Sequence, residues 1–589
     1  MSFGKAFLSS CLGALVAMIV FAVIAVFFLV GLISSAGSEK QVVVAENSVL
    51  HLKLDAQISE LQADDPFEGL PIVGGNVPKI GLLQLKEAIA HAKNDSKIEG
   101  IYLEVSYPMT GFASLEEIRE SLIDFRESGK WVVAYNEVMS ESAYYLASAA
   151  SEVYLHPEGE IEFNGLTAEV GFYKNLLDKL EIRPQVFRVG EFKSAVEPFL
   201  LEKMSEENRT QLQEMVNSIH DHVLTQVSES RKIPKDVLKS VADKMQIRNA
   251  AAAVEFKLVD SLMYMDQFHA NLQKRLGVSD TDDIKFVKYN KYRKSFSNYK
   301  SSKNEIAVIV ADGAIMPGSN DNSEQVIAAD PYVEEIRKAR EDDDIKAIVL
   351  RVNSPGGEFR ASDMIWREIE LTKKVKPVIA SMSDYAASGG YYLSMGCDTI
   401  VAQPHTITGS IGIFGILFDM SGFLGNKLGI TFDEVRTGDF GDTYTVTRPL
   451  NQVEKNFIQK NLEDHYDTFT RKAAQGRGVE QSDILRVASG RVWTGAQAKE
   501  RKLVDVLGGF NDAVRIAANK ANVGDDYKVR YYPRQKPFFE QLVTQLEENA
   551  STSKIESELG ELKVYYNQLR KVQHYQGAEA ILPFELQIH

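Results

Sequence analysis

The sequence has little cysteine and no excess of positive charge. Only two cysteines occur in 589 residues, Cys11 inside an apolar run and Cys397 in a stretch that we expect to be buried. This leaves no basis for a disulfide framework or a cysteine-rich zinc site. Acidic residues outnumber basic ones 82 to 66, giving a net charge of −16, so a phosphate backbone would be repelled. We therefore expect no nucleic-acid partner.

One short run departs from this acidic background. Residues 288–303 (KYNKYRKSFSNYKSSK) are basic and aromatic, a composition also found in patches that bind nucleic acid or lipid. The run falls between two similar halves of the chain. We therefore interpret it as a solvated linker.

Charged side chains are also absent from residues 6–38. Within this stretch residues 12–33 are almost continuously apolar, which is long enough for a helix of roughly 20 residues to cross a bilayer. A cleaved signal peptide is the alternative, but its apolar region is usually only about 7–15 residues. Lys5 precedes the run, which favours a cytoplasmic N-terminus and a body outside the cytoplasm.

The remaining chain contains an internal repeat. Residues 98–108 (IEGIYLEVSYP) match residues 345–355 (IKAIVLRVNSP), and residues 144–146 match residues 391–393 in the same register. The chain is therefore predicted to be a tandem duplication.

Each copy alternates short β-branched runs with helical stretches. In the second copy, strands are expected at residues 348–352, 378–382 and 399–402, and a helix at residues 361–373. This alternation is typical of parallel strands with crossover helices, so each half is predicted to be an α/β domain. We expect an anchor at residues 1–40, a first repeat at 41–300, a second repeat at 301–535 and a helical tail at 536–589.

Ser388 is the candidate nucleophile. It follows an expected strand and precedes an expected helix, where free N–H groups favour negative charge, and the next residue, Gly389, is a candidate oxyanion donor. The second donor is expected from Gly356 or Gly357, at the end of the preceding strand. A serine before two glycines is also typical of a simple helix N-cap. The first copy has Glu141 at the position of Ser388, which argues against a folding role shared by both copies.

Lys193 is the candidate base. The sequence has no G-x-S-x-G elbow to support a Ser-His-Asp triad, and His405 is the one histidine worth testing. Apolar neighbours of Lys193 would favour its neutral form, which can accept the serine proton, provided that Glu191 and Glu197 point away. The second copy has Gly441 at the position of Lys193. Because each copy keeps one of the two residues, the site is expected to span both halves.

Four motifs together resemble those of the long, duplicated form of bacterial signal peptide peptidase A, a family of Ser-Lys peptidases. They are Asn353-Ser354-Pro355-Gly356-Gly357, Ala387-Ser388-Gly389-Gly390-Tyr391, Gly409-Ser410-Ile411-Gly412 and residues 192–199 (FKSAVEPF). The resemblance covers about residues 45–535. Where the related Clp subunit has its catalytic histidine, this chain runs through residues 409–414, so that triad does not transfer.

The resemblance implies a fold, a site and a setting. The fold would be two tandem spiral ββα domains, similar to the Clp protease subunit and to crotonases. Ser388 would be the nucleophile and Lys193 the base, with Ser410 orienting the lysine and the oxyanion donors near Gly356, Gly357 and Gly389. The protein would be a homotetramer of the bacterial plasma membrane, in contact with lipid through residues 12–33, with its catalytic body on the periplasmic side.

The expected function is cleavage of apolar peptides, such as residual signal peptides, through an acyl-enzyme and without a metal or organic cofactor. Two other classes stay open at this point. A crotonase-like acyl-CoA enzyme would share the scaffold, and a membrane-anchored scaffold protein would bind peptides without cleaving them. CoA binding and acylation of Ser388, respectively, distinguish them.

Overall fold

The computed structural model describes residues 42–62, 78–296, 301–319 and 326–533, together with short pieces at 13, 17–18, 20–21, 579–581 and 587–588. The predicted membrane span at residues 12–33 and the predicted tail at 536–589 thus fall mainly outside the described residues. Among the residues that are described, no helix is both long and apolar enough to cross a bilayer.

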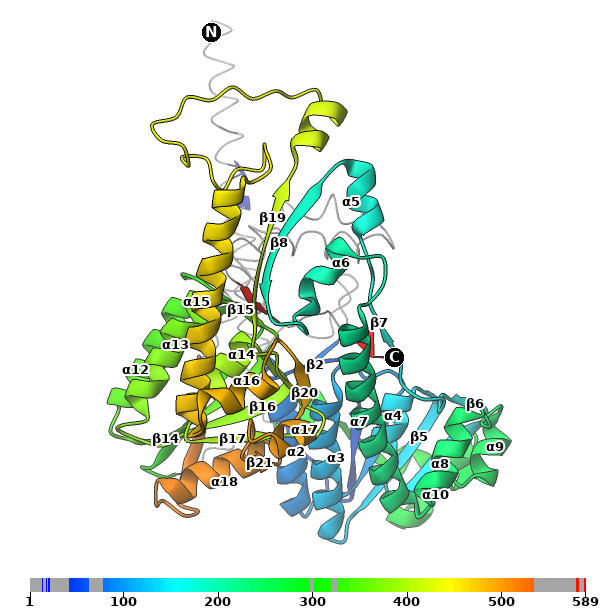
Figure 1. Cartoon of the computed structure of the whole chain (residues 1–589). Helices are drawn as coiled ribbons and strands as arrows, with labels where there is room; N and C mark the ends of the chain where they lie inside the picture. The colour runs from blue at the N-terminus through cyan, green and yellow to red at the C-terminus, as the bar shows by residue number, and fades with distance from the viewer. Residues whose placement is uncertain are drawn as a thin grey trace, which may run out of the picture.

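The first half of the chain forms a parallel sheet with helices around it (Figure 1). Its strands, in spatial order, are β10 (Lys285–Lys288), β1 (Ser48–Lys53), β4 (Ile98–Glu104), β5 (Trp131–Met139), β6 (Glu152–Ile161) and β9 (Ser261–Leu262). The main helices are α2 (Leu82–Asn94), α3 (Phe112–Glu127), α4 (Glu141–Ala147), α7 (Glu206–Arg231), α8 (Lys235–Asp243), α9 (Ala250–Glu255) and α10 (Met265–Leu276).

The second half repeats this plan. The strand order is β20 (Val492–Thr494), β18 (Ile407–Gly409), β16 (Val378–Ala387), β14 (Ile345–Ser354), β11 (Glu305–Asp312) and β22 (Lys528–Tyr532), with β17 (Thr399–Ala402) beside β16 and β21 (Val506–Leu507) beside β17. The main helices are α12 (Ala329–Glu341), α13 (Phe359–Thr372), α14 (Gly389–Ser394), α15 (Gln452–Arg477), α16 (Gln481–Val487), α17 (Gly495–Glu500) and α18 (Phe510–Lys520). The strands and the helix predicted in this half are confirmed.

The strands of the second sheet carry apolar side chains on both faces, because each face packs against a buried core. Val308, Val349 and Ile379 enter a core with α18, whereas Ile309 and Leu350 enter a second core on the other side of the sheet. Side chains alternate between the faces of a strand, so adjacent residues enter different cores. This is the pattern of a parallel sheet with helices on both sides.

The interpretation of residues 288–303 as a solvated linker is wrong for its first part. Strand β10 pairs in parallel with β1, and α11 (Tyr289–Tyr292) follows it directly. Tyr292 is fully buried, and its hydroxyl donates a hydrogen bond to Asp95. The first part of this run therefore belongs to the folded domain, because its aromatic rings are buried between the basic side chains.

A third sheet joins the two halves. Its strands, in order, are β13 (Val326–Ala328), β12 (Ala314–Met316), β15 (Gly356–Glu358), β23 (Glu579–Ile581), β19 (Ile413–Asp419) and β8 (Arg183–Val189). β8 comes from the first half and pairs antiparallel with β19 from the second. In Figure 1 these two strands rise together, beside α5 (Lys174–Leu180) and α6 (Glu197–Leu200), into a projection above the two parallel sheets.

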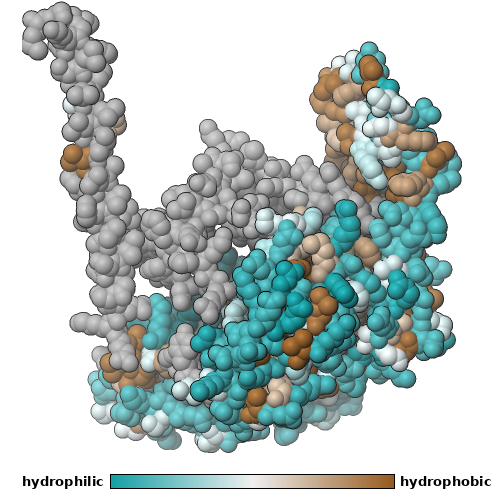
Figure 2. Space-filling view, turned by 90° about the vertical axis from the view of Figure 1, so that its left-hand side faces the viewer, coloured by the Kyte–Doolittle hydropathy of each residue, from teal (hydrophilic) through white to brown (hydrophobic). Residues whose placement is uncertain are grey.

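The projection carries exposed apolar side chains. Figure 2 shows brown surface on it, and the loop that follows β19 contributes Leu428, Ile430, Phe432, Val435, Phe440, Tyr444 and Val446. Grouped exposed apolar residues mark surfaces that contact a partner or a membrane.

A buried ion network fixes the halves against each other. Arg351 on β14 is fully buried, and its Nε lies 2.7 Å from a carboxylate oxygen of Glu60. Its Nη1 lies 2.6 Å from a carboxylate oxygen of Glu117 on α3, which also pairs with Lys86. A second link comes from Asp384 on β16, whose carboxylate accepts hydrogen bonds from the N–H and the hydroxyl of Ser114 on α3.

Candidate active site

Ser388 lies between β16 and α14, fully buried, in a conformation that few serines adopt. Its φ is 54° and its ψ is −111°. Positive φ in a residue other than glycine is strained and persists only when the surroundings hold it. Here its N–H donates to the carbonyl of Gly409 (2.8 Å), and its own carbonyl accepts the first hydrogen bond of α14 from Tyr392 (2.8 Å).

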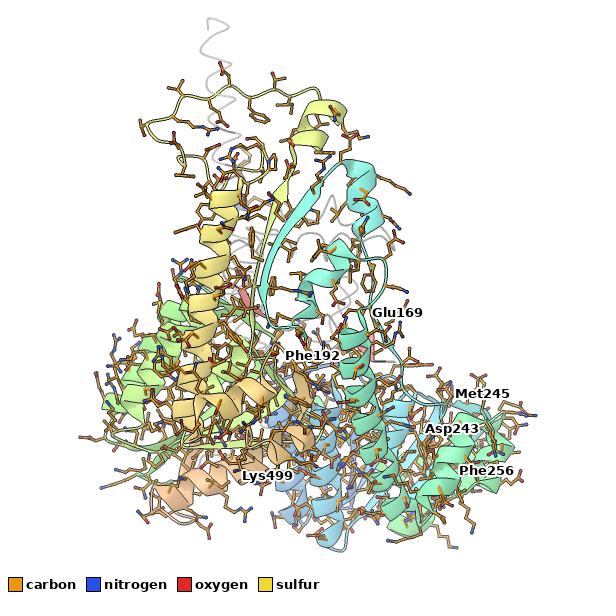
Figure 3. The ribbon with its side chains drawn as sticks, in the orientation of Figure 1. Glu169, Phe192, Asp243, Met245, Phe256 and Lys499 are labelled. Carbon is orange, nitrogen blue, oxygen red and sulfur yellow. The ribbon has the colours of Figure 1, made fainter. Side chains whose placement is uncertain are left out.

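Lys193 lies directly after the loop that follows β8, at the start of a short 3-10 helix (Ser194–Val196). Its neighbour Phe192, labelled in Figure 3, lies at the base of the projection. The Nζ of Lys193 is 2.9 Å from the Oγ of Ser388. The structure thus brings together, within one chain, a lysine from the first half and a serine from the second.

Burial controls the charge of this lysine. Lys193 is fully buried, and desolvation holds the pKa of its amine well below the ordinary value. The predicted orientation of the nearby glutamates is confirmed. Glu191 is exposed, and Glu197 accepts hydrogen bonds from the Ser205 hydroxyl (2.6 Å) and the Asn208 amide (3.1 Å). Neither carboxylate is therefore directed at Lys193 to offset the desolvation.

Ser410 holds the other side of the amine. Its Oγ is 3.0 Å from the Nζ of Lys193, and its carbonyl accepts a hydrogen bond from the same nitrogen (3.2 Å). Like Ser388, it has a positive φ, 50°. The N–H of Ser410 donates to the carbonyl of Arg491 (2.8 Å).

Two glycines near the lysine were not predicted from the sequence. A Cβ on Gly490 would lie 2.7 Å from the Cβ of Lys193, and one on Gly412 would lie 3.3 Å from its Cδ. The absent side chains leave room for the lysine stem to reach Ser388. Gly412 belongs to the motif at residues 409–412. Gly490 follows a helix, where glycine is common in turns, so the sequence alone does not link it to Lys193.

The candidate oxyanion donors lie beside Ser388. The amide of Gly356 donates to the hydroxyl of Ser354 (3.2 Å). A Cβ built on Gly389 would lie 3.0 Å from the amide nitrogen of Gly357, so the two backbones approach closely here. The backbones of Gly357 and Gly389 thus come close together beside Ser388.

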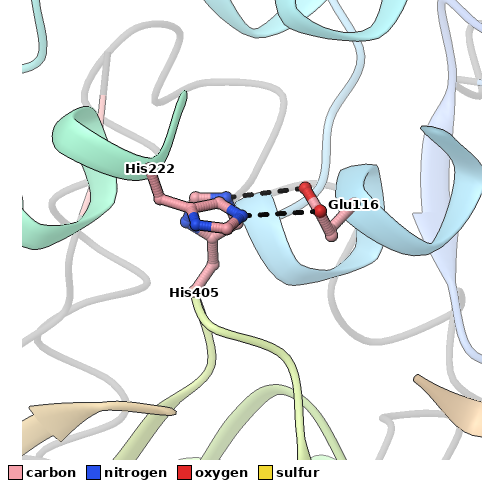
Figure 4. Close-up of side chains that lie close together, drawn as sticks. All are labelled: Glu116, His222 and His405. Carbon is pink, nitrogen blue, oxygen red and sulfur yellow. Dashed lines mark ion pairs between the residues drawn. The ribbon is translucent and has the colours of Figure 1, made fainter. Parts of the chain in front are cut away.

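His405 belongs to a different cluster (Figure 4). Its Nε2 lies 3.7 Å from a carboxylate oxygen of Glu116 and 3.4 Å from the hydroxyl of Tyr145, and its ring stands edge-on to that of His222. Burial and the neighbouring His222 and Arg119 hold the pKa of His405 well below its ordinary value. Among the described contacts of His405, none is with Ser388 or Lys193.

Glu116, His222 and His405 are also a set that can hold a cation. Their candidate ligand atoms lie within 4.8 Å of one another, and two imidazoles with a carboxylate suit a divalent metal. Because none of the three contacts the dyad, we assign this set no part in the chemistry.

The first repeat has a glutamate at the position of Ser388. Glu141 begins α4, the counterpart of α14, and is buried. Its carboxylate accepts hydrogen bonds from the N–H groups of Asn164 (3.1 Å) and Gly165 (2.8 Å). A structural carboxylate thus occupies the place of Ser388.

Known proteins match the chain over most of its length. The family model "Peptidase family S49" matches residues 124–279 and again residues 370–524, once in each half. "Protease 4" of Haemophilus influenzae is 34% identical over 524 residues, covering 86% of this chain and 84% of the relative. "Serine protease SPPA, chloroplastic" of Arabidopsis thaliana is also 34% identical, covering 84% and 72%. "Protease 4" of Salmonella typhi is 37% identical, covering 77% and 74%.

Solved structures match shorter parts. A membrane-bound stomatin-specific protease, solved with a substrate peptide, is 19% identical, with a TM-score of 0.26, covering 42% of this chain and 99% of that one. A ClpP1 mutant of Listeria monocytogenes is 14% identical, with a TM-score of 0.23, covering 35% and 94%.

Proposed function

Because the chain belongs to peptidase family S49 and is a serine peptidase, we propose that it hydrolyses peptide bonds with Ser388 as nucleophile and Lys193 as general base. The observation that carries this proposal is the 2.9 Å distance between the Nζ of a fully buried lysine and the Oγ of a serine held at positive φ. The family membership favours a peptidase over an acyl-CoA enzyme or a scaffold without activity.

The mechanism follows from the charges and donors of the site. The neutral amine of Lys193 takes the proton of Ser388 as Oγ attacks the peptide carbonyl. The N–H groups of Gly357 and Gly389 hold the oxyanion. The protonated lysine then gives its proton to the leaving amine, and water, activated by the same lysine, hydrolyses the ester. Ser410 orients the amine throughout.

Substrate and setting are part of the proposal. The substrates would be apolar peptides, including residual signal peptides. The apolar run at residues 12–33 would hold the protein in the bacterial plasma membrane with its body on the periplasmic side. The exposed apolar side chains of the projection would contact neighbouring subunits of a homotetramer or the membrane surface.

The test is hydrolysis of a fluorogenic apolar peptide by the full chain in detergent. Ser388→Ala and Lys193→Met should each lower kcat by at least about a thousandfold, as expected when a nucleophile or its base is removed. His405→Ala is the matched control for a buried ionisable group outside the dyad and should retain wild-type kcat. If Lys193→Met keeps near-normal activity, the base is misassigned.

A further inference from the structure

Three ionisable side chains form a cluster away from the dyad, at the joint between the two halves (Figure 4). Glu116 lies on α3 and His222 on α7, both in the first half, whereas His405 lies in the second half, in the loop between β17 and β18. Glu116 and His405 are buried, and the side chain of His222 is 26% exposed. The cluster therefore joins the halves and can be reached from solvent past His222.

The atoms that face one another in this cluster lack ordinary partners. The Oε2 of Glu116 and the Nε2 of His222 are buried and, within the part of the chain that the structure describes, take part in no hydrogen bond. The Nε2 of His405 has a long contact of 3.4 Å with the Tyr145 hydroxyl. A buried polar atom without a partner costs free energy, so several of them in one place indicate a missing ligand.

The carboxylate of Glu116 also lacks a compensating charge. Among the described residues it forms no ion pair with a lysine or an arginine, and its charge partners are the two histidines. The neighbouring Arg119 directs its Nη1 and Nη2 to the carbonyls of Tyr145 (2.7 Å) and Gln226 (2.9 Å). Burial holds the pKa of His405 well below its ordinary value, which favours the neutral imidazole that binds metals. A cation would therefore offset the buried carboxylate.

The distances in the cluster suit a tetrahedral metal ion. The Nε2 of His222 lies 3.5 Å from one carboxylate oxygen of Glu116, and the Nε2 of His405 lies 3.7 Å from the other. Candidate ligand atoms of all three residues lie within 4.8 Å of one another. Zinc bonds of about 2.0–2.2 Å at tetrahedral angles place neighbouring ligand atoms about 3.4 Å apart. Small side-chain movements would therefore complete the site.

We propose that Glu116, His222 and His405 bind one divalent transition-metal ion, with Zn²⁺ the best match, which ties α3 and α7 to the loop between β17 and β18. Two imidazoles and a carboxylate are a ligand set that zinc accepts, with a fourth position left for water. β18 ends at Gly409, whose carbonyl accepts the N–H of Ser388. The ion would therefore stabilise the joint between the halves, and no residue of the dyad is among its ligands.

The first test measures zinc binding by the full chain in detergent. The protein is stripped of metal with a chelator, freed of the chelator and titrated with Zn²⁺ in competition with a fluorescent zinc indicator. The wild type should bind one ion per chain, and His222→Gln and Glu116→Gln should each bind it at least about tenfold more weakly, since each alters one ligand. Absence of binding by the wild type, or unchanged affinity in either variant, would overturn the site.

His465→Gln is the matched control. Like His222, His465 lies on a 26-residue helix, is partly buried and has a ring nitrogen without a hydrogen-bond partner among the described residues. It does not belong to the cluster, so this variant should keep the zinc affinity of the wild type. Equal losses of affinity in His222→Gln and His465→Gln would refute the assigned ligands.

Cobalt(II) reports the geometry of the site. Tetrahedral Co²⁺ absorbs visible light far more strongly than the octahedral aqueous ion, so its spectrum shows how the bound ion is coordinated. The wild type and His465→Gln should gain a strong visible band when Co²⁺ is added, and His222→Gln should not. A weak spectrum of the octahedral type in the wild type would contradict the assigned coordination.

Thermal unfolding tests the proposed stabilisation. A ligand that binds only the folded protein raises Tm as its concentration rises. Zn²⁺ should raise the Tm of the wild type and of His465→Gln by several degrees and have little effect on His222→Gln. A Tm of the wild type that does not respond to Zn²⁺ would overturn the stabilisation. None of these readouts requires hydrolysis, and kinetic comparisons of the dyad made with chelator present exclude the metal, so this proposal and the proposed function can fail separately.

Discussion

At the scale of single residues, Lys193 and Ser388 are both held in unfavourable states: burial lowers the pKa of the lysine amine, and the serine backbone has a positive φ of 54°. Each condition costs free energy: burial disfavours the ammonium form, and positive φ disfavours any side chain with a Cβ. The surroundings of Lys193 and Ser388 hold both residues through Ser410 and Gly409. Such costs are expected at a site where reactivity was selected above stability.

Replacing the buried amine should therefore stabilise the protein. Lys193→Met is expected to raise the free energy of unfolding at pH 7 by about 1–2 kcal/mol, because no group has to be desolvated. The pKa of Lys193 is lowered by folding, so the unfolded chain binds the extra proton. The advantage of the variant should thus shrink as the pH approaches 10.5, where the unfolded lysine also becomes neutral. Denaturant unfolding at several pH values measures this.

A lysine at the surface supplies the control. The side chain of Lys460 is 69% exposed, so Lys460→Met should change stability by less than about 0.5 kcal/mol at any of these pH values. Destabilisation by Lys193→Met would show that the amine contributes to folding and is not held at a cost.

At the scale of elements, the loop at Gly490 positions the lysine. Gly490 has a φ of 77°, and a Cβ there would meet the backbone and the Cβ of Lys193. Gly490→Ala should therefore displace the amine from Ser388 and lower kcat about 10- to 100-fold, in addition to a loss of stability of about 1–3 kcal/mol from strain. Steady-state kinetics and thermal unfolding measure the two effects.

A control at Gly478 distinguishes displacement of the lysine from backbone strain. It ends α15 with a φ of 62°, and a Cβ there would meet nothing within 4 Å. Gly478→Ala should lose about 1 kcal/mol of stability for the same backbone reason but keep wild-type kcat. Equal losses of activity in the two variants would mean that the Gly490 loop has no special effect on the dyad.

Sequence patterns predicted the elements that repeat and missed those that do not. The β-branched runs of β14, β16 and β17 indicate strands because both faces of a parallel sheet are apolar. Strand β23 has only three residues, Glu579–Ile581, and no periodicity of its own. Its pairing partners, β15 and β19, lie far away in the sequence, so no local pattern encodes the pairing. The role of Gly490 could not be predicted for a similar reason, since Lys193, which it contacts, is far away in the sequence.

At the scale of the whole molecule, the proposed activity requires the two halves to be held together, because Lys193 comes from one half and Ser388 from the other. The dyad joins β16 of one half to the segment after β8 of the other, and the network around Arg351 fixes the halves nearby. The sequence predicted this division, because each repeat keeps one of the two residues. It did not predict the network, since Glu60, Glu117 and Lys86 are ordinary charged residues until the fold buries them.

Removing the arginine should therefore be costly. Arg351→Met leaves the buried Glu60 and Glu117 without their common partner, and we expect a loss of about 3–5 kcal/mol of stability. Arg337, whose side chain is 50% exposed beside Glu368, is the control, and Arg337→Met should cost less than about 1 kcal/mol. Chemical denaturation compares them. Similar small losses in both variants would show that the network does not hold the halves.

Covalent labelling tests whether Lys193 activates Ser388 within one chain. The full-length protein is treated with a serine-directed acylating or phosphonylating probe, and the modified peptide is identified by mass spectrometry. Ser388 should be modified in the wild type and in His405→Ala, and the labelling rate should fall at least about a hundredfold in Lys193→Met. Labelling at another serine, or an unchanged rate in Lys193→Met, would contradict this activation.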